Sequence, residues 1–169
     1  SRIQADRAVA AIRSDDGERA TSLAAEARDL AAGDPAAEAE ADRIIGLLAR
    51  EHGDLARART ALERSRATAA GLDDPLPSIA ANNGLALVAL DEGDPEGAIA
   101  LAESALATVL RTGERHLEAA LENNLADALE AAGRREEAME HLKAAAAAFA
   151  EVRQVADEPE PGIWMLESW

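Results

Sequence analysis

Cysteine is absent from this chain, and aromatic residues make up only 2% of it. The absence of cysteine excludes disulfides, thiolate metal sites and thiol nucleophiles. Long apolar runs are also missing, since no stretch approaches the roughly 20 apolar residues that span a bilayer. No positively charged start followed by an apolar segment marks a secretory signal. We therefore expect a cytoplasmic protein that does not contact a membrane.

Cations are scarce as well. The 17 lysines and arginines stand against 33 acidic residues, which gives a formal net charge of -16. A field of this sign repels phosphate backbones and anionic lipids. We therefore expect no direct contact with nucleic acid.

Residue patterns typical of catalysis or metal binding are missing too. His52, His116 and His141 lack the spacing of a zinc site, and no HExxH, GxSxG or Gly-rich phosphate loop occurs. The sequence thus predicts no catalytic residue, no metal and no cofactor, and we expect that the protein is not an enzyme.

What the chain does have is a regular period. Gly53, Gly93 and Gly133 lie forty residues apart. An alanine follows each glycine by five residues and an aliphatic side chain precedes each by eight, namely Ala58, Ala98 and Ala138, and Ile45, Leu85 and Leu125. Self-similarity over roughly 20 to 50 residues is typical of a repeat array. The apolar residues, 48% of the chain and mostly alanine, favour helices that pack closely.

Clusters of Gly, Pro and Asp separate segments of about 15 to 20 residues with helical apolar spacing. The breaks lie at residues 15–17, 33–35, 53–54, 71–77, 93–95, 112–113 and 133. Asp34-Pro35 and Asp94-Pro95 each place an N-cap acceptor before a proline at the first helical position. We predict one all-α domain of eight helices, paired as four antiparallel hairpins in a right-handed superhelix.

The predicted divisions are an irregular first hairpin (1–35), three repeats (36–75, 76–113 and 114–155) and a C-terminal tail (156–169). In the first hairpin Arg7 takes the aliphatic position and the turn glycine is displaced to Gly17. A terminal repeat is expected to be atypical, but an excised upstream neighbour would look the same. The start on Ser1 without a methionine also indicates a piece of a longer protein.

The stretch from Asn123 to Ala145 resembles a tetratricopeptide repeat, because small and large residues alternate where the two helices of that family interlock. The same register fits the two preceding units, so the resemblance covers about residues 39–150. It implies a superhelix of hairpins with a concave groove. The forty-residue period exceeds the family's usual 34 or so, which implies longer helices, like those of kinesin light chains. Alanine or leucine also replaces the family's bulky aromatics.

The ending from Glu158 to Trp169 is similar to the tail of repeat arrays at the carboxyl end of actinobacterial ATP-binding regulators of the SARP and LuxR types. This second resemblance implies that the chain is the end of a longer polypeptide, in which a nucleotide-switch domain precedes the repeats.

The tetratricopeptide register also implies a stripe of side chains that faces the groove. The stripe comprises Glu40, Arg43, Leu47 and Arg50, then Asn83, Leu87 and Asp91, then Asn123, Asp127 and Glu130. Asn83 and Asn123 share one repeat position, and stacked amides can hold an extended peptide backbone because each one both donates and accepts. The alternative is that Asn82-Asn83 and Asn123-Asn124 stabilise the packing between repeats.

Arg43 and Arg50 lie seven residues apart on one helical face. They can bind a ligand carboxylate or pair with their neighbours Glu40 and Glu51. Trp164 and Trp169 are candidates for docking a partner or for capping the open end of the array.

Two functions follow from these features. The first is an interaction module whose groove holds a protein or peptide, including the missing domains of its own chain. The second is a ligand-sensing regulatory arm of a multidomain ATP-binding transcriptional regulator.

Overall fold

The structure is a computed structural model that describes residues 17–155, with side chains described from residue 22 to residue 152. Seven helices and no strand make up this part of the chain. Their bounds are α2 (Gly17–Leu30), α3 (Pro35–Glu51), α4 (Leu55–Ala69), α5 (Leu76–Asp91), α6 (Pro95–Thr112), α7 (Arg115–Ala131) and α8 (Arg135–Val155). The all-α prediction is confirmed. The first predicted helix, the region around Arg7 and the C-terminal tail lie outside the described residues.

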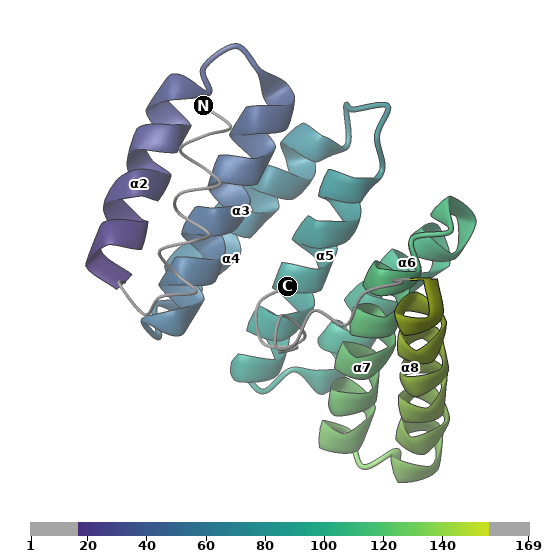
Figure 1. The fold of residues 1–169 in the computed structure, drawn as a ribbon. Coiled ribbons are helices and arrows are strands. Elements are labelled where there is room, and N and C mark those ends of the chain that lie inside the picture. Colours follow the sequence, from purple (N-terminus) through teal and green to yellow (C-terminus); the bar gives the residue numbers. More distant parts are fainter. Residues whose placement is uncertain (1–16, 156–169) are drawn as a thin grey trace.

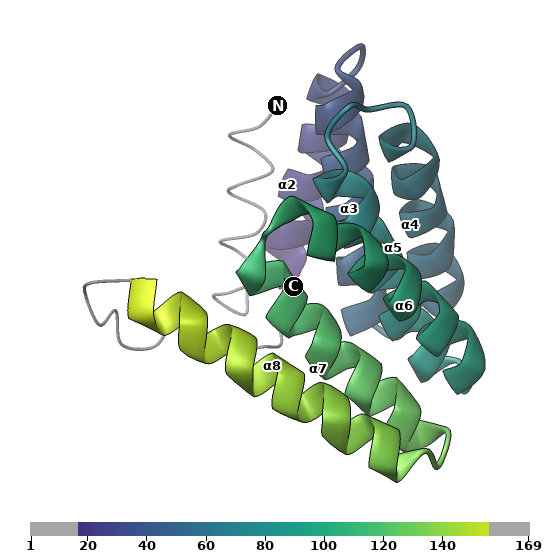
Figure 2. The same cartoon turned by 90° about the vertical axis from the view of Figure 1, so that its right-hand side faces the viewer.

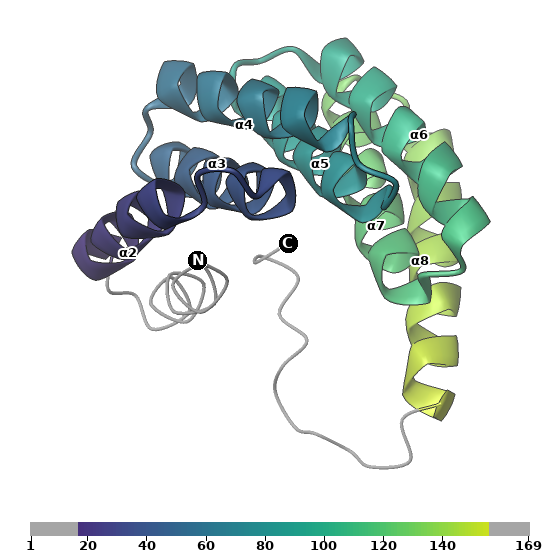
Figure 3. The same cartoon turned by 90° about the horizontal axis from the view of Figure 1, so that it is seen from above.

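The helices stack as successive antiparallel hairpins, α3 with α4, α5 with α6, and α7 with α8 (Figure 1). The last of these pairs is seen side by side in Figure 2. Viewed from above, the hairpins follow an arc in which α3, α5 and α7 form the inner layer and α4, α6 and α8 the outer one (Figure 3). Adjacent inner helices pack on one another, and each of α4 and α6 packs on the following inner helix.

A left-handed glycine ends the first helix of each of these hairpins. Gly53, Gly93 and Gly133 have φ angles of 76°, 79° and 80°, a region that only glycine enters without steric cost. In each turn the residue after the glycine donates its N–H to a carbonyl five residues back, as Asp54 does to Ala49 at 2.8 Å. This bond pattern satisfies carbonyls that the helix end leaves open. The forty-residue glycine period therefore marks the turn within each hairpin, where an inner helix ends and its outer partner follows.

Aspartate starts three of the helices. The side chain of Asp34 accepts from the N–H of Ala37 at 3.2 Å, that of Asp54 from Arg57 at 3.1 Å, and that of Asp94 from Gly97 at 2.9 Å. Each bond satisfies one of the backbone donors that a helix N-terminus exposes. The predicted N-caps at Asp34 and Asp94 are therefore confirmed.

Two glycines without a turn role allow helices to pack closely around Leu62 of α4. A Cβ atom on Gly46 of α3 would lie 2.6 Å from Leu62 Cγ, and one on Gly84 of α5 would lie 2.7 Å from Leu62 Cδ2. Both distances are shorter than real Cβ contacts allow. The fully buried Leu62 side chain thus fits between the first and second repeats because both neighbouring helices lack a side chain there.

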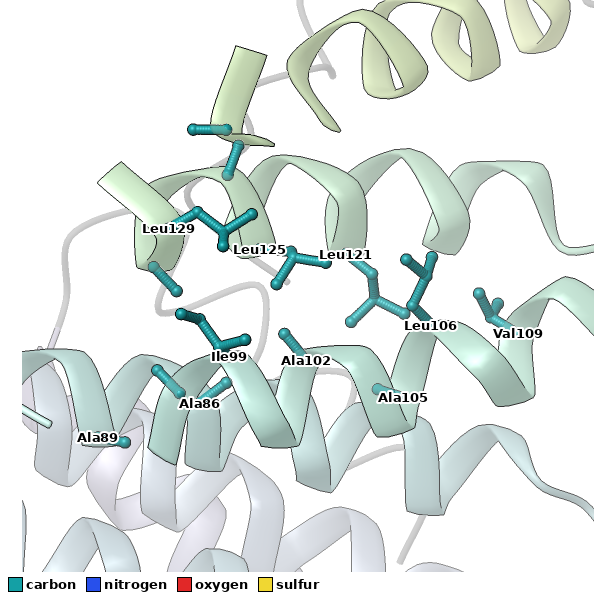
Figure 4. Packing of buried hydrophobic residues seen from close by; sticks show 14 of the residues in the cluster. Ala86, Ala89, Ile99, Ala102, Ala105, Leu106, Val109, Leu121, Leu125 and Leu129 are labelled. Carbon is teal, nitrogen blue, oxygen red and sulfur yellow. The ribbon is translucent and has the colours of Figure 1, made fainter. Parts of the chain in front are cut away.

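The main apolar core lies between α5, α6 and α7. Figure 4 shows Ile99, Ala102, Leu106 and Val109 of α6 against Leu121, Leu125 and Leu129 of α7. Alanine on one helix opposite leucine on the next lets the pair interdigitate, which is how dense cores are filled.

Buried charged side chains join neighbouring helices. The Asp42 carboxylate of α3 is almost fully buried and accepts from Arg28 of α2 at 3.2 Å and from Arg64 of α4 at 2.9 Å. Between α7 and α8, Glu122 Oε2 lies 2.6 Å from His141 Nδ1. These pairs compensate for the loss of hydration that burial of an acid entails.

Candidate functional site

The inner layer contains a cavity of about 460 Å³ where α3, α5 and α7 meet. Its walls are mostly apolar and come from the first turns of α5 and the first half of α7. The lining residues are Glu40 and Arg43, then Asp74, Leu76, Pro77, Ile79, Ala80 and Asn83, then Leu117, Ala120 and Leu121. Binding cavities of roughly 300 to 1,000 Å³ with apolar walls and a few polar groups are typical of ligand sites.

Small residues create this space. Ala80 of α5 and Ala120 of α7 lie three residues before Asn83 and Asn123 in the sequence, so each is one helical turn away on the same face. Leucine or isoleucine at these positions would occupy part of this volume. The Asp74 carboxylate accepts from the N–H of Leu76 at 3.0 Å and so supports the start of α5 at the edge of the cavity.

Glu40 and Arg43 form the polar wall contributed by α3. The Arg43 guanidinium donates from Nε to Glu40 Oε2 at 2.8 Å and from its terminal nitrogen to Oε1 at 2.7 Å. Two parallel bonds of this kind fix the orientation of both side chains. Arg43 therefore pairs with its helical neighbour Glu40, which was the alternative to binding a ligand carboxylate. The same side chain also lines the cavity.

The two asparagines at one repeat position lie in different surroundings. Asn83 is buried, and its Oδ1 accepts from Asn124 Nδ2 of the next repeat at 2.7 Å. Asn123 is half-buried on α7, with its Nδ2 at 3.5 Å from Asp127 Oδ2. Asn83 thus joins α5 to α7 at the floor of the cavity, which corresponds to the packing alternative for that residue.

The remaining stripe residues lie farther along the inner helices. Arg50 of α3 donates from Nε to Asp91 Oδ2 of α5 at 2.5 Å and so connects two repeats. Leu47 and Leu87 are half-buried and lie about one helical turn before Arg50 and Asp91, respectively. They do not line the cavity.

Asp127 and Glu130 make the end of α7 acidic. Both are exposed. Partial burial raises the pKa of Asp127 above its ordinary value, and the charge of nearby Glu130 raises it further. A carboxylate in this position is stabilised by an incoming cation, because opposite charge lowers its pKa again.

The structure therefore brings Arg43 and Asn83 to one cavity, joins Arg50 to Asp91, and leaves Asn123, Asp127 and Glu130 together on α7. Sequence reasoning did not name Ala80, Leu117 and Ala120, which line the cavity. Extending the stripe by one helical turn toward the helix starts reaches Ala80 and Ala120, but nothing in the sequence marks these two alanines as the wall of a cavity. Trp164 and Trp169 lie outside the described residues.

Within residues 17–155, no helix is both long and apolar enough to cross a membrane. The same part of the chain contains no group of three or more side chains arranged to hold a metal ion.

Comparison with protein families supports the repeat assignment. Residues 78–151 match the family model of the tetratricopeptide repeat, which spans α5 to α8. No curated protein matches the sequence.

Solved structures with the same architecture include a kinesin light chain with nearly identical TPR-like repeats from Podosopora anserina, at 23% identity and a TM-score of 0.64 over 89% of this chain and 75% of that one. BtubC (BKLC) from P. vanneervenii is 17% identical, with a TM-score of 0.74 over 96% of this chain and 68% of that one. MamA is 19% identical, with a TM-score of 0.63 over 89% and 79%. These similarities confirm the predicted superhelix of tetratricopeptide-like hairpins.

Proposed function

We propose that the chain is an interaction module whose concave groove binds an extended segment of a protein or peptide. The observation that carries the proposal is the cavity of about 460 Å³ on the inner layer, with apolar walls and the fixed polar pair of Glu40 and Arg43. Superhelical repeat proteins use their concave surfaces to bind partners. The proposal assigns no reaction and no cofactor to the chain.

The cavity favours a partner that inserts an apolar side chain. Leu76, Leu117 and Leu121 present hydrocarbon to it, and burial of one large apolar side chain contributes roughly 1.5 to 3 kcal/mol. A charged side chain would instead lose its hydration against these walls. The apolar contact is therefore the anchor of the proposed complex.

The acidic end of α7 adds a second requirement. Ala120 lines the cavity and Asp127 lies seven residues later on the same face, about 10 Å along the helix at 1.5 Å per residue. An extended peptide covers that distance in about three residues. A partner segment with an apolar residue and, about three positions away, an arginine or lysine would fit both features. The formal net charge of -16 also favours a basic partner.

The partner can belong to the same polypeptide. The similarity of residues 158–169 to the tails of ATP-binding transcriptional regulators supports a second candidate function, in which the module is a regulatory arm in the cytoplasm. In that case the groove binds another domain of the regulator, and a ligand that displaces this domain changes its activity. The binding surface is the same in both proposals.

A cavity-filling substitution tests the proposed groove. Peptides are selected from a display library against the unmodified protein, and their affinity is measured for Ala80→Phe. The added ring occupies the cavity, so we expect affinity to fall about tenfold or more, the equivalent of one lost apolar anchor. Ala100→Phe, on an exposed position of the outer helix α6, is the matched control and should bind normally. Equal affinity of Ala80→Phe and the unmodified protein, with both folded, would contradict the proposal.

A further inference from the structure

Helix α8 has an apolar stripe that the described residues cover only in part, mainly at its C-terminal end. Met139 is 53% exposed and Leu142 is 38% exposed. One and two turns further along the same face, Ala146 is exposed and Phe149 is half-buried, with an edge-on ring contact made by His116 of α7. We call Met139, Leu142, Ala146 and Phe149 the terminal stripe.

The repeat period shows what such a stripe normally does. Forty residues earlier, the equivalent positions on α6 are Ile99, Ala102, Leu106 and Val109. All four are at most 8% exposed, because they pack against the leucines of α7 (Figure 4). The terminal stripe is thus the face with which an outer helix of this array packs against the next element, and its apolar character is retained on α8.

We propose that residues 156–169 of this chain cover the terminal stripe. This segment of 14 residues begins directly after α8. Its last seven residues, 163–169, include Ile163, Trp164, Met165, Leu166 and Trp169. Five large apolar side chains in seven residues can bury an exposed apolar face, because both surfaces are removed from water on contact.

The segment is long enough to reach the stripe. Residues 156–162 contain two prolines and a glycine, and seven extended residues span about 23 Å. Phe149 lies six residues before Val155, about 9 Å along the helix, and Met139 lies sixteen residues before it, about 24 Å. The apolar part of the segment can therefore turn back and run along α8 from Phe149 toward Met139.

A tethered segment fits this face better than a second copy of the chain. From Met139 to Phe149 the stripe extends about 15 Å along the helix, whereas stable interfaces between proteins bury about 1,200 to 2,000 Å² in total. A short linker holds the segment near α8 at an effective concentration in the millimolar range. A small apolar contact is then sufficient, although it would be weak between separate molecules.

The two tryptophans make the proposal directly measurable. The chain has two tryptophans, and both lie in the segment, so intrinsic tryptophan fluorescence reports on this segment alone. If the segment covers the stripe, emission is that of partly buried indole and quenching by acrylamide is limited. In the double variant Met139→Glu with Leu142→Glu we expect emission at longer wavelength and stronger quenching. Both positions are exposed, so circular dichroism should show an unchanged helix content.

Matched variants separate the competing occupants. Leu110→Glu alters a leucine of α6 that is 55% exposed and lies off the terminal stripe, and it should leave the emission unchanged. An unchanged emission in the α8 double variant would overturn the proposal. A shift in Ala80→Phe without one in the α8 variant would place the segment in the groove instead and also overturn it. Emission that depends on protein concentration, with dimers in sedimentation, would assign the stripe to a second copy.

Discussion

At the scale of single residues, the amides of α5 and α7 have separable tasks. Asn83 is buried with its oxygen bound to Asn124, while Asn123 is half-buried beside Asp127 on the inner face of α7. A buried amide that loses its partner group affects the fold. An amide at the surface of the groove affects what binds there.

We therefore expect the two alanine substitutions to differ. Asn83→Ala should lower the free energy of unfolding by about 1 to 3 kcal/mol, because it removes a buried bond and leaves the Asn124 amide without this acceptor. Asn123→Ala should change stability little and weaken binding of a selected peptide. Denaturant unfolding and titration of both variants provide the measurement. Equal stability losses in the two variants, with affinity intact, would remove Asn123 from the groove and assign it to packing.

Consecutive residues on a helix differ in direction by about 100°, so the two amides of each Asn-Asn pair face different neighbours. The sequence does not show which amide of a pair faces the groove. The repeat register was enough to pair Asn83 with Asn123, since it depends only on the forty-residue spacing. Which of Asn82, Asn83, Asn123 and Asn124 points to a neighbouring helix depends on how far each helix is rotated about its own axis. Packing sets that rotation, as the contact of Leu62 with the two helical glycines illustrates.

At the scale of helices, the strongest sequence signals were the helix ends. Gly53, Gly93 and Gly133 all have positive φ, so their positions could be predicted from backbone sterics alone. The cavity could not be predicted in the same way, because it results from small residues on two helices that meet only in the fold. Ala80 and Ala120 look like ordinary helix formers in the sequence.

The packing of α7 against α8 predicts a pH dependence of stability. His116 of α7 packs edge-on against Phe149 of α8, with ring centroids 6.3 Å apart, and burial lowers the pKa of His116 below its ordinary value. The unfolded chain therefore takes up this proton at a higher pH than the folded one. As pH falls below about 6.5, protonation favours the unfolded state, and the free energy of unfolding should decrease.

Thermal or denaturant unfolding between pH 8 and pH 5 measures this effect. His116→Phe keeps an aromatic partner for Phe149 and removes the titrating group, so its stability should fall less steeply over the same interval. His52→Gln, at an exposed position after α3, is the control and should retain the full decrease. The idea fails if His116→Phe and the unmodified protein lose stability in parallel.

At the scale of the whole molecule, the chain carries a large excess of negative charge. The formal net charge is -16, while inter-repeat ion pairs such as Arg50 with Asp91 and Arg59 with Glu92 lie near the surface. Exposed pairs of this kind contribute about 0 to 1 kcal/mol each. Repulsion among the unpaired carboxylates acts on the whole array and opposes its compact form.

Salt should therefore act in opposite directions on folding and on binding. The Debye length falls from about 30 Å at 0.01 M to about 8 Å at 0.15 M ionic strength, which screens repulsion within the array and should raise the melting temperature. The same screening should weaken binding of a peptide that carries an arginine opposite Asp127 and Glu130. A peptide with glutamine in place of that arginine should bind with little salt dependence, and titrations of both peptides at the two ionic strengths provide the comparison. If both peptides respond to salt alike, the acidic end of α7 does not take part in recognition, and the apolar cavity alone accounts for binding.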